Sequence, residues 1–184
     1  MTKALRDVVP SDSEMLLAWR NLPEVSKYMY TDHEITRAEH DEWFARVLND
    51  LTKRFWILMV DGADVGLVNV TDIDLHNSRC TWAFYIAETA QRGRGVGAFA
   101  EFEVLRYVFE ELRLNRLWCE VLDFNTSAQK MHRRFGFVHE GTRRQHIMKD
   151  GEYHDVEVFS ILKEEWDKGC DALESDLTRK RVFE

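Results

Sequence analysis

The segment from residue 80 to residue 112 joins two different hydrophobic patterns through a glycine-rich turn. Residues 80–87 (CTWAFYIA) form an apolar run of strand length, and residues 96–112 (VGAFAEFEVLRYVFEEL) have the apolar spacing of a long helix. Between them, residues 91–99 (QRGRGVGAF) contain three of the chain's nine glycines. The first N–H groups of a helix lack intrahelical partners, and glycines let a ligand approach them closely. The segment therefore predicts a phosphate-binding turn at the head of a helix.

Two Asp-Gly pairs predict β-hairpins, because this dipeptide suits a tight two-residue turn. Asp61-Gly62 separates the apolar runs 55–60 and 63–73, and Asp150-Gly151 separates residues 137–148 from residues 152–162. Two more strands are predicted at residues 4–10 and 114–122.

Capping signals predict where the helices begin and end. Ser11 and Thr36 each stand three residues before a glutamate, as in a capping box. Asn125 opens a further helix, which Gly136 ends. The order is strand, two helices, three strands, helix, strand, helix, two strands. This order predicts an α+β fold, a single domain whose mostly antiparallel central sheet carries helices on both faces.

Length and composition favour one ordinary globular domain. The chain has 184 residues and a formal net charge of −8, which argues against general nucleic-acid binding. No apolar run has membrane-spanning length, and the first ten residues do not resemble a signal peptide, so a cytoplasmic protein is expected. Three cysteines without C-x-x-C spacing form neither a disulfide framework nor a zinc site, and no metal is expected. We expect the domain over residues 1–170, followed by a charged tail or short helix over residues 171–184.

The glycine turn fails the patterns of two common phosphate loops. The nucleoside-triphosphate loop needs Lys-Ser/Thr after its last glycine, where this chain has Ala98 and Phe99. The dinucleotide fingerprint needs a different spacing from that of Gly93, Gly95 and Gly97.

The turn does fit R-x-x-G-x-G, with Arg92, Gly95 and Gly97. Residues 125–137 (NTSAQKMHRRFGF) fit N-x-x-A-x-x-x-Y-x-x-x-G-F, with His132 in the place of the tyrosine. In these two motifs and in its strand order the chain resembles the GNAT superfamily of acetyl-CoA-dependent N-acetyltransferases, over about residues 4 to 162.

The resemblance implies a site for acetyl-CoA as co-substrate. The strand before the turn would hydrogen-bond the pantetheine arm, the turn would hold the pyrophosphate, and the start of the next helix would help to hold the cofactor. The residues implied in these roles are Phe84, Tyr85, Ile86, Arg92, Gly93, Arg94, Gly95, Val96, Gly97 and Asn125.

Amine acetylation needs a proton donor for the leaving thiolate and an acceptor for the amine proton. The resemblance implies that His132 is the acid. The alternative is that His132 has no catalytic role and only packs at the edge of the core. Glu120, a carboxylate inside an apolar strand, is a candidate base if it is buried; otherwise it faces outward, and His33 or a water chain takes the proton. No cysteine has the surroundings of a low-pKa nucleophile, so direct transfer in a ternary complex is expected.

The acceptor is expected to depend on the N-terminal helices. Residues 18–44 and 149–162 resemble the sugar-nucleotide subgroup of GNAT enzymes that acetylates UDP-4-amino-4,6-dideoxy-N-acetyl-β-L-altrosamine in pseudaminic-acid synthesis. A UDP-amino sugar is therefore the expected small-molecule partner. Binding to nucleic acid or to a membrane is not expected. The residues expected to bind the acceptor are Arg20, Met29, Tyr30, His33 and Trp43. For Trp43 the alternative is packing in the core.

Other functions stay open from the sequence. The same scaffold acetylates ribosomal-protein N-termini or aminoglycosides, and an acidic pocket would favour such cationic substrates. A non-catalytic acetyl-CoA sensor is a further alternative. The sequence also leaves the oligomeric state open, with a homodimer as one alternative.

Overall fold

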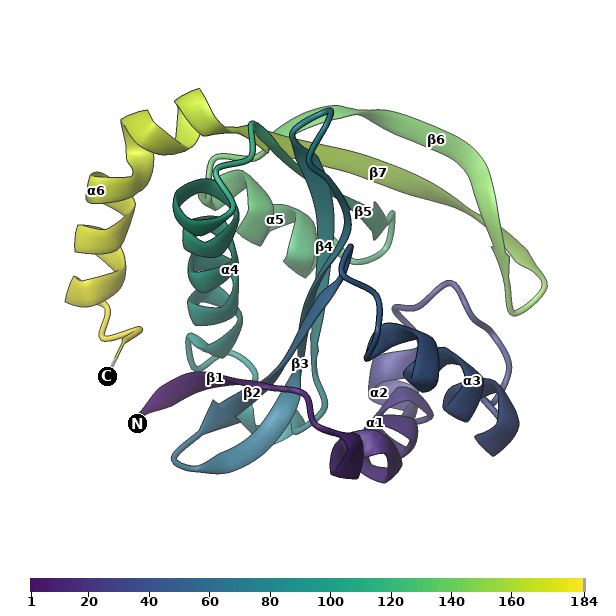
Figure 1. Ribbon diagram of the computed structural model, residues 1–184. Coiled ribbons are helices and arrows are strands. Elements are labelled where there is room, and N and C mark those ends of the chain that lie inside the picture. The colour runs from purple at the N-terminus through teal and green to yellow at the C-terminus, as the bar shows by residue number, and fades with distance from the viewer. Residues whose placement is uncertain (184) are drawn as a thin grey trace.

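The computed structural model describes residues 1–183, and within them all strands belong to one sheet (Figure 1). The strand order is β1-β2-β3-β4-β5-β7-β6, and every neighbouring pair is antiparallel except β4 and β5. The strands are β1 (Lys3–Asp7), β2 (Arg54–Val60), β3 (Ala63–Asp74), β4 (Arg79–Ile86), β5 (Arg116–Leu122), β6 (Val138–Lys149) and β7 (Glu152–Leu162).

Helices cover both faces of the sheet, as the sequence predicted (Figure 1). One face carries α1 (Ser13–Arg20), α2 (Pro23–Ser26) and α3 (Arg37–Val47), and the other carries α4 (Val96–Arg106), α5 (Thr126–Arg134) and α6 (Lys163–Arg179). Each face has its own hydrophobic core. Leu16, Val25, Phe44 and Ile57 belong to the smaller core under α1 to α3.

Both predicted hairpins are confirmed. Asp61 and Gly62 connect β2 to β3 with positive φ angles of 49° and 81°, and Asp150 and Gly151 connect β6 to β7 with 51° and 83°. The Thr36 capping box is also confirmed, because Thr36 Oγ1 accepts from the backbone N–H of Glu39 at 3.3 Å.

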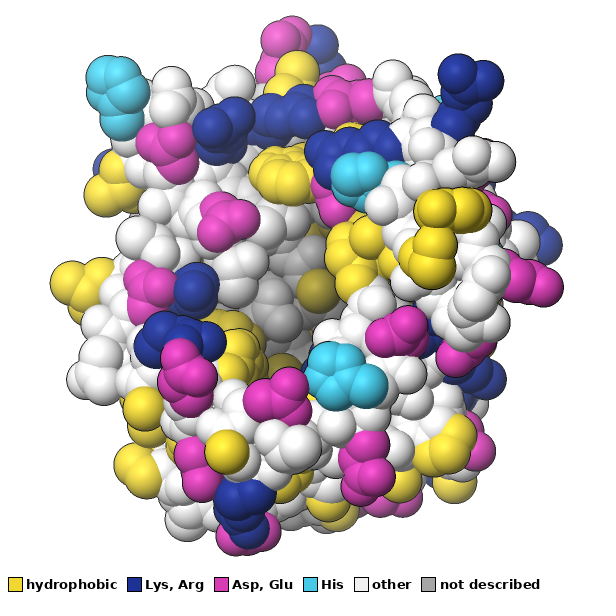
Figure 2. Space-filling view, turned by 90° about the vertical axis from the view of Figure 1, so that its right-hand side faces the viewer, with side chains coloured by type: hydrophobic (Ala, Val, Ile, Leu, Met, Phe, Trp, Pro, Cys, Tyr) yellow, Lys and Arg dark blue, Asp and Glu magenta, His cyan; other side chains and the backbone are white. Residues whose placement is uncertain are grey.

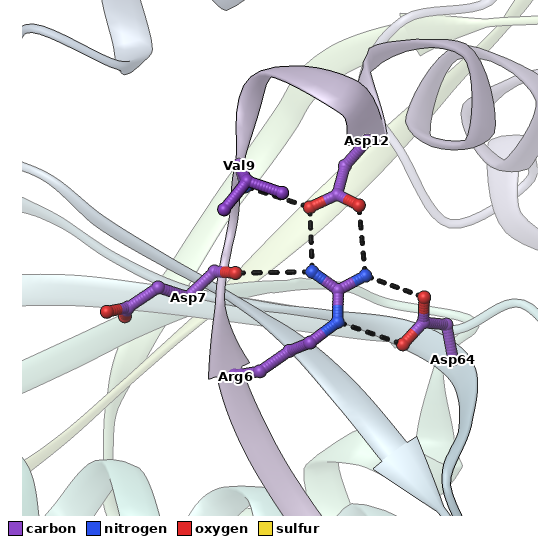
Figure 3. Close-up of polar contacts among 5 residues, drawn as sticks. All are labelled: Arg6, Asp7, Val9, Asp12 and Asp64. Atoms are coloured by element: carbon purple, nitrogen blue, oxygen red, sulfur yellow. Dashed lines mark hydrogen bonds and ion pairs between the residues drawn. The ribbon is translucent and has the colours of Figure 1, made fainter.

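The predicted capping box at Ser11 is wrong. The chain forms a short 3-10 turn at Pro10–Asp12, and α1 starts only at Ser13, with Asp12 before it. Asp12 accepts a hydrogen bond from the backbone N–H of Val9 at 2.9 Å and two from the Arg6 guanidinium (Figure 3). Arg6 also donates to Asp64 of β3. This tertiary network, which a local capping pattern does not contain, fixes the chain between β1 and α1.

The C-terminal residues belong to the folded body. Helix α6 passes through residue 170, the expected end of the domain, and Leu177 and Val182 are buried in the larger core. Lys3 Nζ donates to the backbone carbonyl of Val182 at 2.7 Å, which joins the two ends of the chain (Figure 1). A charged tail and a short helix are the two forms expected for residues 171–184. The described part of this segment is mostly helix.

The parallel pair β4–β5 shapes the rest of the molecule. Its register holds only over Arg79–Thr81 and Arg116–Trp118. Beyond these residues the two strands separate while each keeps its antiparallel neighbour. The separation opens the sheet in the middle.

Candidate active site

A cleft of about 600 Å³ begins where β4 and β5 separate. Its walls come from β4, from β5, from the first turns of α4 and α5, and from the chain after α2. The side of the molecule that carries α1 to α3 and the β6–β7 hairpin is hollowed near its centre, with hydrophobic and charged side chains around the hollow (Figure 2).

The glycine turn forms one end of the cleft. Gly93 and Gly95 have φ angles of 75° and 80°, a region that glycine enters without steric cost. Gly95 is the N-cap of α4, so the N–H groups of Val96, Gly97 and Ala98 have no intrahelical acceptor. These groups, together with the helix dipole, make this end of the cleft suitable for an anion.

Two glycines allow close packing beside the cleft. A Cβ at Gly97 would lie 3.3 Å from the Phe84 ring and 3.4 Å from Met131 Sδ. A Cβ at Gly66 would lie 2.2 Å from the carbonyl oxygen of Tyr85, so β3 needs a glycine here to pair with β4. The role of Gly66 was not predicted, since an isolated glycine in a strand does not indicate what it packs against.

The Arg92 side chain has a different role from the expected one. Its guanidinium donates to the backbone carbonyl of Ile86 at 2.7 and 3.2 Å and to that of Glu24 at 3.0 Å. Arg92 therefore ties the glycine turn to the end of β4 and to α2.

Asn125 caps α5, because its Oδ1 accepts a hydrogen bond from the backbone N–H of Ala128.

His132 lines the middle of the cleft although only 4% of its surface is exposed. Its ring lies edge-on to Trp82, with ring centroids 5.5 Å apart. Its Nδ1 lies 2.7 Å from Oε1 of Glu101, which is completely buried. The imidazole is thus held between an aromatic wall and a carboxylate.

The far end of the cleft carries Glu120, whose side chain is 18% exposed and ion-paired. One carboxylate oxygen pairs with Arg143 of β6, and the other accepts a hydrogen bond of 2.6 Å from the Tyr30 hydroxyl. Burial and the Glu120 carboxylate raise the pKa of Tyr30, which keeps its hydroxyl a donor. Glu120 is therefore partly buried, between the two alternatives that the sequence leaves open. Its partners Arg143 and Tyr30 come from distant parts of the chain, so the strand pattern does not indicate them.

The cleft brings together most of the predicted residues. Besides those described above, Met29, Phe84, Tyr85 and Ile86 line it. Its lining does not include Arg20, His33, Trp43, Arg94 or Val96.

These outlying residues have other surroundings. Trp43 packs against Phe55 and joins the core under α1 to α3, which was the alternative considered for it. His33 lies at a separate hollow and pairs with Glu39 at 3.1 Å. Arg20 lies near Tyr85, and its Nη1 has no hydrogen-bond partner among the described residues.

Two features of the cleft were not predicted. Tyr28 stacks on Phe124 with ring centroids 6.2 Å apart, which links the chain after α2 to the β5–α5 connection. Glu101 stands behind His132. The sequence carried a signal for Glu101, because a charged residue interrupts the apolar face of the helix formed by Ala98, Phe102 and Leu105.

Residues 1–183 contain neither a side-chain cluster suited to a metal ion nor a helix suited to a membrane. No group of three or more His, Cys, Asp or Glu side chains in this range could hold a metal ion. Within the same range, no helix combines the length and the apolar character that crossing a membrane requires.

Comparisons with known proteins agree with this geometry. A family model described as "Acetyltransferase (GNAT) domain" matches residues 4–138. The protein named "Putative ribosomal N-acetyltransferase YdaF" from Bacillus subtilis is 26% identical over 172 residues, which cover 89% of this chain and 92% of YdaF. Acetyltransferase PseH from Campylobacter jejuni is 24% identical over 136 residues, covering 74% of this chain and 83% of PseH.

Solved structures share the fold. A spermidine N-acetyltransferase from Vibrio cholerae, in complex with CoA and spermine, superposes with a TM-score of 0.83 at 21% identity. The match covers 90% of this chain and 98% of that chain.

The cleft fits acetyl-CoA as a substrate. Free N–H groups at the start of α4 suit its pyrophosphate, and the edge of β4 beyond Thr81 is not paired with β5. The chain therefore belongs to the GNAT acetyltransferase family and is an acetyl-CoA-dependent N-acetyltransferase.

Proposed function

We propose that this enzyme acetylates the 4-amino group of a UDP-linked 4-amino-6-deoxysugar, by direct attack of the amine on acetyl-CoA within a ternary complex. The observation that carries the proposal is the charge at the far end of the cleft. There Glu120 is ion-paired with Arg143 and hydrogen-bonded by Tyr30, so its carboxylate already has a cationic partner.

The charge of the whole cleft supports the same acceptor class. Its lining contains two carboxylates, Glu24 and Glu120, against Arg92, Lys130 and Arg134, although the whole chain carries a net charge of −8. A polyamine would need several unpaired carboxylates to replace its hydration. A neutral or anionic acceptor suits this lining better.

The walls of the far end suit a deoxysugar. Tyr28 and Met29 offer apolar surface for a methyl group and a sugar ring. Arg143, 45% exposed, and the neighbouring exposed Arg144 supply positive charge on β6 for a diphosphate. Arg143, Arg144, Arg20 and His33 all lie outside the lining of the cleft, but Arg143 is ion-paired with Glu120, which lines it.

The proposed reaction uses two residues for proton transfer. The amine nitrogen attacks the thioester carbonyl, and Glu120 takes the amine proton directly or through water. The C–S bond breaks, its electron pair stays on sulfur, and His132 donates a proton to give the thiol. No acyl-enzyme is involved.

A protein N-terminus is the second candidate acceptor. The similarity to YdaF over 89% of this chain supports it, since the name of that protein specifies a ribosomal N-acetyltransferase.

A panel of three amines tests the proposal. Thiol release from acetyl-CoA is measured with UDP-4-amino-4,6-dideoxy-N-acetyl-β-L-altrosamine, a ribosomal N-terminal peptide and spermidine. The sugar nucleotide is expected to have a kcat/KM at least about 100-fold higher, a difference of about 2.7 kcal/mol in transition-state stabilisation. A higher kcat/KM for the peptide or for spermidine would contradict it. The variant Arg143→Met is expected to raise KM for the sugar nucleotide and to leave KM for acetyl-CoA unchanged.

A further inference from the structure

A buried carboxylate stands directly behind the imidazole that lines the cleft. Glu101 is 0% exposed, and its Oε1 lies 2.7 Å from Nδ1 of His132. Its other oxygen, Oε2, has no hydrogen-bond partner among the described residues. Burying a carboxylate costs free energy unless its charge is compensated, and the imidazole of His132 is the group placed to compensate it.

Glu101 and His132 come from different elements, α4 and α5, and meet only in the folded chain. On an imidazole ring the two nitrogens point in different directions, so a bond at Nδ1 leaves Nε2 facing away from Glu101. Because His132 lines the cleft, the nitrogen that is not bound to Glu101 is the one available to a reacting group.

The surroundings of the pair are mostly apolar. Trp82 of β4, Phe137 and Phe159 of β7 contact the imidazole through their rings. The titratable or charged groups that face the pair are Cys119 of β5, within hydrogen-bonding reach of the imidazole, and Arg134 of α5. Glu101 is therefore the main source of negative charge acting on His132.

The two charges stabilise each other. Burial raises the pKa of Glu101, and the positive imidazolium opposes this. Burial by itself lowers the pKa of His132, but the Glu101 carboxylate and the nearby Cys119 side chain together outweigh burial and raise that pKa to about 10. At neutral pH the pair therefore retains one proton that it can give away.

We infer that Glu101 is a positioning residue, which fixes the orientation of His132 and keeps it charged so that Nε2 carries the proton delivered to the departing sulfur. This inference rests on the proposed role of His132 as the acid. When the C–S bond breaks, the Nε2 proton moves to sulfur, and the neutral imidazole still donates its Nδ1–H to Glu101. Solvent then returns one proton to Nε2, while Glu120 releases the amine proton to solvent, so the proton count closes.

The first test measures the protonation of His132 without using turnover. Nitrogen NMR of isotope-labelled imidazoles is recorded on the wild-type enzyme and on Glu101→Gln between about pH 5.5 and 11. Glutamine keeps the shape and still accepts a hydrogen bond but removes the charge. We expect the His132 midpoint to fall by more than about one pH unit in the variant. An unchanged midpoint overturns the inference, whichever amine is the acceptor.

The second test is a double-mutant cycle with His132→Phe. Using an amine that the wild-type enzyme acetylates, Glu101→Gln is expected to lower kcat about 10- to 100-fold with KM for acetyl-CoA unchanged. In the His132→Phe background the same substitution is expected to change kcat less than about 2-fold, since its effect passes through His132. Equal losses in both backgrounds would mean a purely structural role and would overturn the inference.

Controls separate failure to fold from loss of function. Glu103→Gln, on the same helix, is expected to leave both the His132 midpoint and kcat unchanged. Melting temperatures are recorded for every variant. If Glu101→Gln does not fold, Glu101→Asp replaces it, and a smaller lowering of the His132 midpoint is expected because the shorter carboxylate keeps its charge but withdraws from Nδ1. If no amine in the panel is acetylated, the proposed acceptor fails, but the NMR result still decides the inference about Glu101.

Discussion

The Arg92 guanidinium donates two hydrogen bonds to the backbone carbonyl of Ile86, at 2.7 and 3.2 Å. A third hydrogen bond reaches the carbonyl of Glu24 on α2. The guanidinium charge of the R-x-x-G-x-G turn is thus used inside the protein, where it holds the turn against the end of β4. Anion binding at this end of the cleft is therefore expected to depend on backbone N–H groups more than on this side chain.

Replacing Arg92 by alanine should therefore affect stability as well as cofactor binding. Losing these bonds should cost about 1–3 kcal/mol and lower the melting temperature by several degrees. KM for acetyl-CoA should rise at least about 10-fold, because the turn loses its anchor. Thermal unfolding and steady-state kinetics measure the two effects. Arg94→Ala is the matched control, since Arg94 is exposed, does not line the cleft and donates a hydrogen bond to Gln91; an equal loss of stability in both variants would contradict the assignment.

Gly95→Asp should weaken acetyl-CoA binding at least about 10-fold, because it adds bulk and negative charge where the pyrophosphate is expected. The φ angle of 80° also strains any side chain there. Gly62→Asp is the control, since Gly62 has a φ angle of 81° and open space around it at the β2–β3 turn. Calorimetric titration with acetyl-CoA should detect the loss only in Gly95→Asp. Wild-type affinity in that variant would exclude the turn as the phosphate site.

Glu120→Gln should lower kcat about 100-fold if Glu120 accepts the amine proton, with little change in KM for acetyl-CoA. Glu24→Gln, the other carboxylate that lines the cleft, should keep nearly full activity. Comparison of the two variants by steady-state kinetics decides the assignment. Equal activity would transfer the role of base to His33 or to water, and His33→Ala would then distinguish between these two.

Arg6→Met should lower the stability of the enzyme near neutral pH, and the difference from wild type should become smaller in acid. The Arg6 guanidinium holds the pKa of Asp12 below its usual value of 3.8, although burial opposes this shift. A lowered carboxyl pKa stabilises the fold above the unfolded pKa, and this contribution is lost as the pH falls through the folded value. The melting temperature at pH 7 should drop by several degrees, equivalent to about 1–3 kcal/mol, and the difference should shrink below about pH 4.

The control for Arg6 is Lys168→Met, which breaks an exposed ion pair with Glu164 and should leave the melting temperature unchanged. A melting-temperature difference between Arg6→Met and wild type that stays constant from pH 7 to the acid limb would show that Arg6 acts through packing alone.

The local features of the sequence predicted the order of the elements because they depend on near neighbours in the chain. The two Asp-Gly turns, the Thr36 cap and the helix stop at Gly136 all formed as expected. The glycine turn also lies at the head of α4, and Gly93, Gly95 and Gly97 line the cleft. Each of these features satisfies its own backbone within a few residues.

The tertiary structure decided how the charged residues are used. Asp12 pairs with Arg6, Glu120 with Arg143, and His132 with Glu101, and the partners are separated by 6, 23 and 31 residues along the chain. Side chains at such separations meet only when the sheet and its helices pack. The sequence by itself determined an acetyl-CoA-binding scaffold. Packing determined which carboxylates are neutralised and which are buried, and these two properties decide which acceptors the cleft can bind.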